Sequence, residues 1–191
     1  RNPGPNLAAT SSPSRSARRR RRGAGAAVQS PDMQGSAFDE IELFRAIAQS
    51  GARALLIGRR ALVVLGIPVL TGDYDFWLHI DDIAAFNAAV AKFDLRPNRS
   101  PEEARAHGRY VLEDDERVDV LVARTAPTVD GGRVAFDELW PRRQSVAFSP
   151  GVSVAIPTVD DLIATKRFAA RPHDAEDVRL LEALRSKERG S

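Results

Sequence analysis

The chain has 191 residues, of which 43% are hydrophobic and 28% charged, a length that supports one domain with a proper core. It contains no cysteine, which excludes disulfides and thiolate zinc sites. The three histidines, His79, His107 and His173, are too scattered to favour a metal cluster. No apolar run approaches the roughly 18 residues that span a bilayer. We therefore expect a cytoplasmic protein that does not bind a membrane.

The net charge of +2 is divided unevenly along the chain. Residues 1–36 contain seven arginines and one acid, Asp32, so they carry +6 and the remainder −4. This extension is rich in Pro, Ser, Ala, Gly and Arg without a hydrophobic period, which predicts disorder. A basic arm for nucleic acid is one interpretation, and an extension without a role is the one we favour. Because Met33 is the only methionine and directly precedes the first periodic segment, a start at Met33 is a further hypothesis, in which the extension is not native.

From Phe38 onwards the hydrophobic pattern alternates between helical and strand periods. We expect, in chain order, a helix at 38–51, a strand at 52–58, a short helix at 59–67, a strand at 74–80, a helix at 81–93 with Asp81 or Asp82 as its N-cap, a variable region at 94–108, a hairpin of 109–113 and 117–123, a short helix at 134–143, a strand at 152–156, and helices at 158–170 and 172–184. This order predicts an α/β (α+β) fold, in which helices flank a small mixed β-sheet and a helix pair closes the chain.

The stretch LTGDYDFWLHI, residues 70–80, places two aspartates one residue apart in a strand-like pattern. Residues i and i+2 of a strand point to the same face, so Asp73 and Asp75 are expected side by side, about 7 Å apart at Cα. Such carboxylates repel each other unless a cation lies between them. Mg²⁺ or Mn²⁺ would satisfy this pair, because these ions prefer oxygen ligands and complete their shell with water and phosphates.

A third carboxylate, Asp119, lies in the apolar run VDVLV, which predicts a buried strand. Three acids on neighbouring strands could hold metal for phosphoryl transfer. Structural alternatives exist for each: Asp73 could cap its turn, Asp75 could accept from a backbone amide, and Asp119 could pair with Arg109 or Arg117 across the hairpin. The three together favour metal binding. Asp115, in the exposed turn DDE, ranks below Asp119 as the third acid.

Upstream, LLIGRRALVVLG predicts a strand that ends at Gly58 and turns at once into a helix. Gly58 permits a tight turn and a close approach of a ligand. Backbone N–H groups at such a turn can bind phosphate, although strand-Gly-helix sequences are common. Gly58 comes shortly before the aspartate pair, and this position favours a phosphate-binding role for the turn.

Three segments together resemble the small bacterial nucleotidyltransferases of the DNA polymerase β superfamily, above all the abortive-infection (AbiEii-like) toxin nucleotidyltransferases. They are IGRRALVVLGIPVLTGDYDFWL, VDVLV and VDDLIATKRFAARPHDAEDVRLLEAL. The resemblance covers about residues 38–184 and implies a nucleotidyltransferase-like domain over 37–187. By this resemblance Gly58 holds the nucleotide triphosphate, Asp73 and Asp75 bind metal and act in catalysis, and Asp119 completes the site.

The chain departs from the family pattern at two positions. The second small residue of the turn is Arg59 here, and Val69 stands where relatives often carry arginine, whereas Thr71 is kept. Arg59 could contact phosphate as a fork donor or crowd the triphosphate. We include Arg59 and Thr71 among the nucleotide-binding residues.

Near the end of the chain, Lys166 lies on the apolar stripe of the helix at 158–170. It either reaches the site to hold phosphate, as the corresponding lysine of toxin relatives does, or runs along the helix edge into solvent. We interpret Arg171, Asp174 and Asp177 as structural, and Asp177 could pair with Lys166, Arg167 or Arg171. Trp77 and Trp140 are expected to pack in the core.

The resemblance implies a Mg²⁺- or Mn²⁺-dependent enzyme that moves NMP from an NTP to a hydroxyl of RNA, protein or a small molecule. It also implies a toxin role and a cognate antitoxin as partner. The alternative is a non-catalytic binding module with the same fold, which Arg59 and Val69 favour.

Overall fold

The computed structural model describes residues 38–114, 116–128, 131–169 and 172–190. The predicted extension at 1–36, Met33 within it, Asp115 and Arg171 lie outside these residues. The helices are α1 (Glu40–Gln49), α2 (Gly58–Val64), α3 (Ile83–Val90), the short 3₁₀ helix η1 (Ala91–Phe93), α4 (Pro101–His107), α5 (Phe136–Arg142), α6 (Val159–Ala169) and α7 (Pro172–Gly190). The strands are β1 (Ala54–Ile57), β2 (Tyr74–Leu78), β3 (Arg96–Pro97), β4 (Arg109–Glu113), β5 (Arg117–Leu121), β6 (Thr125–Pro127), β7 (Arg133–Ala135), β8 (Gln144–Ser149) and β9 (Val152–Ile156).

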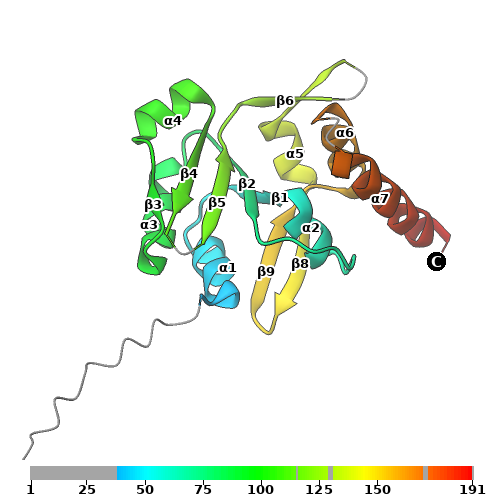
Figure 1. Cartoon of the computed structure of the whole chain (residues 1–191), viewed down its shortest axis with the longest axis horizontal. Coiled ribbons are helices and arrows are strands. Elements are labelled where there is room, and N and C mark those ends of the chain that lie inside the picture. Colours follow the sequence, from blue (N-terminus) through cyan, green and yellow to red (C-terminus); the bar gives the residue numbers. More distant parts are fainter. Residues whose placement is uncertain (1–37, 115, 129–130, 170–171, 191) are drawn as a thin grey trace, which may run out of the picture. The chain divides into compact units, whose positions relative to one another are not determined.

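The central sheet has the strand order β1-β2-β5-β4-β3 (Figure 1). β2 and β5 are parallel, and the other neighbours are antiparallel, including the predicted β4–β5 hairpin. Two further antiparallel pairs, β6–β7 and β8–β9, lie outside this sheet. The predicted small mixed sheet with flanking helices is therefore confirmed.

One face of the sheet, the core face, carries the buried side chains of alternate strand residues. Phe76 of β2 packs against Phe44 of α1 and Phe86 of α3, with ring centroids 6.5 and 5.4 Å away. Val118, on the neighbouring β5, is also fully buried. Burial of a side chain as large as Phe76 contributes about 1.5–3 kcal/mol. This face is the main core of the domain.

The opposite face of the sheet is called the site face. It carries the strand residues that alternate with those of the core face, because successive strand side chains point to opposite faces. Part of it is covered by α5: Trp77 packs against Phe136, and its indole N–H donates to the carbonyl of Ala123 at 2.7 Å. The predicted packing role of Trp77 is confirmed by its 1% exposure. The rest of the site face, with Asp75 and Asp119, is not covered by this helix.

Several elements of the fold were missed by the pattern analysis, among them the strand pair β6–β7. The region at 94–108, expected to be variable, contains β3 and α4. Helix α4 begins with a capping box, in which Ser100 Oγ accepts from the backbone of Glu103 and the Glu103 carboxylate accepts from the backbone of Ser100. Gly108 ends it in the left-handed conformation. Strand β8, the partner of the predicted strand at 152–156, was not expected at all.

Asp82 stands at the N-cap position of α3, as one of the two predicted candidates, but its side chain does not cap the helix. The carboxylate instead accepts from the backbone N–H and Nε of Arg53, at 2.9 and 2.7 Å. The hydrogen bonds from Arg53 hold the pKa of Asp82 below its ordinary value. Asp82 therefore connects the start of β1 to α3.

Helix α6 is held at its first turn by a buried carboxylate. Asp161 accepts from Arg142 of α5 at 2.6 and 2.9 Å and from the hydroxyl of Thr158 at 2.6 Å. Burial alone would raise the pKa of Asp161, but these hydrogen bonds outweigh it and the pKa lies below the ordinary value. The anchored start of α6 fixes where Lys166 lies.

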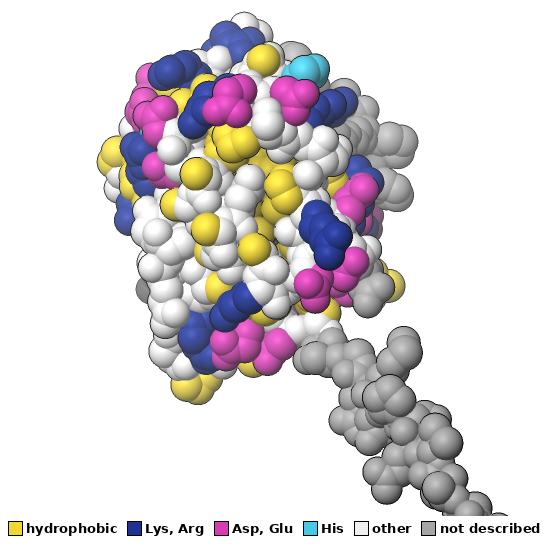
Figure 2. Space-filling view, turned by 90° about the vertical axis from the view of Figure 1, so that its left-hand side faces the viewer, with side chains coloured by type: hydrophobic (Ala, Val, Ile, Leu, Met, Phe, Trp, Pro, Cys, Tyr) yellow, Lys and Arg dark blue, Asp and Glu magenta, His cyan; other side chains and the backbone are white. Residues whose placement is uncertain are grey.

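Figure 2 views the side of the domain formed by α3, α4 and β3. Positive and negative side chains are interspersed there, and single hydrophobic spheres lie between them. Helix α3 itself carries exposed alanines, such as Ala84 and Ala88. Charges of one sign do not dominate this view.

Among the described helices, none combines the length and the apolar character that a membrane span requires.

Candidate functional site

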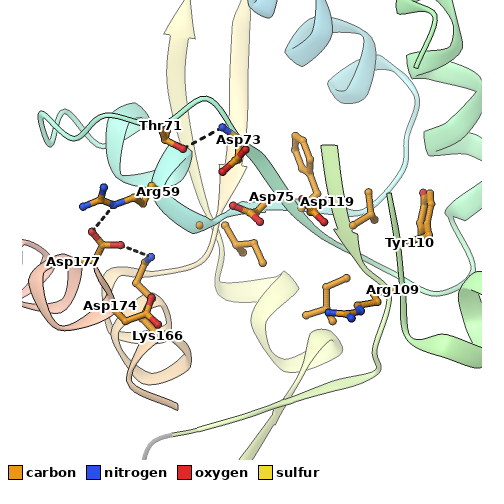
Figure 3. Close-up of a pocket in the computed structure, with 15 residues that line it drawn as sticks. Arg59, Thr71, Asp73, Asp75, Arg109, Tyr110, Asp119, Lys166, Asp174 and Asp177 are labelled. Carbon is orange, nitrogen blue, oxygen red and sulfur yellow. Dashed lines mark hydrogen bonds and ion pairs between the residues drawn. The ribbon is translucent and has the colours of Figure 1, made fainter. Parts of the chain in front are cut away.

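A cavity of about 500 Å³ opens on the site face, between the sheet, α2 and the C-terminal helices (Figure 3). All the residues predicted for the site line this cavity: Gly58, Arg59, Thr71, Asp73, Asp75, Asp119 and Lys166. The fold thus brings together residues from α2, β2, β5 and α6 that are distant in sequence.

The centre of the cavity is a pair of carboxylates on adjacent parallel strands. Asp75 of β2 and Asp119 of β5 are direct partners in the register. Figure 3 shows their side chains next to each other on the site face. Since parallel strands lie about 4.8 Å apart, this register places two like charges at close range. Such an arrangement favours a bound cation.

Gly58 lies directly against the Asp75 carboxylate. Its φ is +67°, and a Cβ there would lie 2.1 Å from Asp75 Oδ2. No other residue has both the backbone freedom and the small size that this position requires. The predicted turn is therefore adapted to the aspartate as well as to any ligand.

Substituting Gly58 by alanine is expected to destabilise the domain through backbone strain and a clash with Asp75. Gly66 is a matched control, because its φ is +81° and a Cβ added there would meet nothing within 4 Å. Gly66→Ala should cost only the strain, about 1–2 kcal/mol. Gly58→Ala should cost a further ~1–3 kcal/mol of overpacking, measured by urea unfolding. Equal costs for the two variants would contradict the tight Gly58–Asp75 contact.

Asp73 lies one residue before β2, so it is not within the strand. Its backbone N–H donates to Thr71 Oγ1 at 3.2 Å. Two consecutive arginines of α2 hold this loop from outside: Arg59 donates to the carbonyl of Leu70 and Arg60 to that of Thr71, each at 3.3 Å. The loop that carries Asp73 is therefore fixed by α2.

Asp119 is not buried as the apolar run predicted. Val118 and Val120 are buried on the core face, but the Asp119 side chain is 40% exposed on the site face. It accepts from Arg117, its neighbour on the same strand, at 2.9 and 3.3 Å. The alternative that pairs Asp119 with Arg117 is therefore observed, along one strand and not across the hairpin. Arg109, the other proposed partner, lines the cavity instead.

The donor set suits Mg²⁺ or Mn²⁺, because carboxylate oxygens are the ligands these ions prefer. Asp75 and Asp119 are adjacent, and Asp73 lines the same cavity. Within the described part of the chain, however, no group of three acidic or histidine side chains is already arranged around a common point. The engagement of Asp119 with Arg117 is one physical reason. Metal binding would make Asp119 share its carboxylate between the ion and Arg117.

A buried carboxylate, Asp177 of α7, joins the two predicted phosphate-binding cations. Its side chain is 1% exposed and accepts from Arg59 Nε at 3.0 Å and from Lys166 Nζ at 2.9 Å. Arg59 also contacts Glu176 at 3.3 Å. The Lys166 side chain is 10% exposed, so it does not run along the helix edge into solvent.

Sequence reasoning gave no site role to three residues that line the cavity: Asp174, Asp177 and Arg109. The signal for Asp177 was its possible pairing with Lys166, which the structure shows. For Arg109, the signal was its place at the start of a strand beside Asp119. The structure adds that Asp177 also binds Arg59, from α2.

No protein-family model matches the sequence, and no curated protein is significantly similar to it. Among solved structures, the solution structure of the antibiotic-resistance factor ANT(2'')-Ia matches with a TM-score of 0.53 and 16% identity, over 78% of this chain and 88% of that one. A crystal structure of ANT(2'')-Ia in complex with adenylyl-2''-tobramycin gives 0.47 and 14%, over 78% and 94%. A candidate nucleotidyltransferase of Thermotoga maritima gives 0.47 and 13%, over 78% and 90%. The likeness at 0.53 confirms the predicted nucleotidyltransferase fold.

Proposed function

We propose that this chain transfers a nucleoside monophosphate from an NTP to a hydroxyl group and releases pyrophosphate. The observation that carries the proposal is the Asp75–Asp119 pair on adjacent parallel strands, beside Arg59 and Lys166 in one cavity. Paired carboxylates suit a metal ion, and the cations suit the phosphates it would accompany. The fold shared with ANT(2'')-Ia supports this assignment.

In this proposal the cations and the turn bind the donor. Arg59 and Lys166 neutralise phosphate charge, while Thr71 and the Gly58 turn contact the phosphate oxygens. Bound Mg²⁺ or Mn²⁺, held by Asp73, Asp75 and Asp119, would supply further charge neutralisation.

The reaction balances with one proton transfer. The acceptor oxygen forms a bond to the α-phosphorus, and the bond between that phosphorus and the oxygen bridging to the β-phosphate breaks. Pyrophosphate leaves with the electron pair, and the acceptor proton passes to the Asp119 carboxylate. Asp73 and Asp75 would hold the metal ion that accompanies the phosphates of the NTP.

We further propose that the acceptor is RNA or protein and that the chain acts as the toxin of a toxin–antitoxin pair. The support is the resemblance of the closing segment, residues 159–184, to the abortive-infection toxins. A cognate antitoxin would then be a partner.

The direct test is label transfer by the full chain. Each α-labelled NTP is incubated with Mg²⁺ or Mn²⁺ and either total bacterial RNA or lysate protein as acceptor. We expect label on one acceptor class with at least one NTP, and loss of transfer when EDTA removes the metal. Transfer that persists in excess EDTA would contradict metal dependence.

One observation favours a second function, a non-catalytic binding module. Arg117 already engages Asp119 at 2.9 Å and so takes the place of a cation. Nucleotide-dependent stabilisation separates the two functions, because a ligand at 100 times its Kd adds about 2.7 kcal/mol. Absence of both label transfer and stabilisation by Mg²⁺–NTP would favour the module.

A further inference from the structure

A second, smaller cavity of about 290 Å³ lies next to the site, between the sheet, β6, α5 and α6. Its walls are mostly apolar and include Trp77, Ala126, Leu139 and Leu162. We call it the apolar chamber. The larger cavity, in contrast, is lined by five aspartates and three basic residues. The apolar chamber therefore suits a less polar part of a ligand than the larger cavity does.

The two cavities meet at the centre of the proposed site. Gly58, Asp75, Lys166 and Asp174 line both of them. Asp119 and Arg109 line only the larger cavity. The apolar chamber therefore adjoins Asp75 and Lys166, which are proposed to hold the donor, whereas Asp119, which is proposed to receive the acceptor proton, does not line it.

The chamber is apolar because of the strand register. Trp77 and Leu121 are partners on β2 and β5, two residues beyond the Asp75–Asp119 pair on the same face. Leu139 of α5 packs against this pair in a hydrophobic cluster that also contains Phe136. The site face thus changes from charged to apolar within one strand repeat.

Few polar groups project from the described walls of the chamber. Pro127 and Pro157 have no backbone N–H to offer. Thr165 directs its hydroxyl to the carbonyls of Asp161 and Leu162 in its own helix, at 2.9 and 3.2 Å. A ligand group in the chamber would be held by shape and apolar contact more than by hydrogen bonds.

We infer, resting on the proposed function, that the apolar chamber receives the nucleobase and ribose of the donor nucleotide. The phosphates of the same molecule lie in the larger cavity. Asp75 and Lys166, which line both cavities, then lie between the nucleoside and the phosphates. A volume of about 290 Å³ lies at the small-molecule end of binding sites, so it suits a nucleoside and excludes a macromolecular acceptor. The shortage of polar groups implies that different bases bind with affinities within about tenfold of one another.

The test fills the chamber without altering the phosphate-binding residues. Ala126 of β6 is half-buried and lines only this chamber, and Thr165 of α6 lies on another wall. The variants Ala126→Leu and Thr165→Leu are compared with Ala48→Leu, an exposed alanine that lines a separate cavity of about 460 Å³. Calorimetry with Mg²⁺ measures binding of the four NTPs and of inorganic tripolyphosphate to each full-length protein.

We expect both chamber variants to weaken NTP binding by at least about tenfold, because the added leucine side chain takes the space of the ligand. A tenfold rise in Kd corresponds to about 1.4 kcal/mol of binding free energy. Tripolyphosphate binding should be unchanged, and Ala48→Leu should bind every probe like the parent. NTP binding unaffected by either folded chamber variant would overturn the inference and leave the proposed function intact. Equal weakening of NTP and tripolyphosphate would also overturn it. Failure of the parent protein to bind either probe would refute the proposed function and this inference with it.

Discussion

Substituting Asp75 by asparagine is expected to lower nucleotide transfer by on the order of a hundredfold to a thousandfold. Asp75 is the residue where the features of the site converge: it is opposite Asp119, it contacts Gly58, and it lines both cavities. Asparagine keeps its shape and removes its charge. Transfer of an α-labelled NTP to acceptor, measured as an initial rate, checks this result.

Stability separates a functional role of Asp75 from a structural one. Because Asp75→Asn removes the like-charge repulsion between Asp75 and Asp119 on adjacent strands, it should leave the free energy of unfolding unchanged or raise it. Asp94 is a matched control: it is exposed, and its φ of 59° is one that asparagine tolerates. Asp94→Asn should change neither rate nor stability. A marked loss of stability in Asp75→Asn would indicate that this carboxylate serves the fold.

The local parts of the site could be predicted from the sequence. The spacing of Asp73 and Asp75, the strand around Asp119 and the turn at Gly58 are all written in stretches of a few residues. The structure places them in one cavity because β2 and β5 are neighbours. Helix α4 was equally predictable, since Ser100 and Glu103 form a capping box, but its signal was overlooked.

The contacts between distant segments could not be predicted in the same way. Arg59 and Asp177 are separated by 118 positions, and their contact depends on how α7 packs near α2. The close approach of Gly58 to Asp75 likewise follows from the pairing of Ile57 with Asp75 across β1 and β2. Local periodicity specifies which face a residue occupies, and tertiary packing decides what it meets there.

These long-range contacts give a structural role to Arg59, which stands where the nucleotidyltransferases that this chain resembles carry a small residue. Asp177 accepts from both Arg59 and Lys166. A small residue at position 59 would remove the first of these two contacts. Arg59 adds a second cation and also holds the loop before Asp73 through the carbonyl of Leu70. The arginine therefore connects α7, α2 and the loop that carries Asp73, which is a structural role compatible with phosphate binding.

Substituting Asp177 by asparagine is expected to destabilise the domain by about 3–5 kcal/mol, the usual cost of removing one partner of a buried ion pair. Asp177 is 1% exposed, and its loss leaves Lys166, 10% exposed, without its carboxylate partner. Urea unfolding of the variant and the parent measures the difference. The same change should weaken tripolyphosphate binding, because Arg59 and Lys166 lose their common anchor.

Asp160 provides the control for the Asp177 variant. Its carboxylate pairs with Arg185 at 2.9 Å, but its side chain is 58% exposed. Exposed ion pairs contribute little, so Asp160→Asn should cost no more than about 1 kcal/mol. If the two variants were equally mild, the Arg59–Asp177–Lys166 cluster would not anchor α7. If Asp177→Asn were unstable but bound tripolyphosphate normally, the cluster would serve the fold alone, and the two cations would reach phosphate without it.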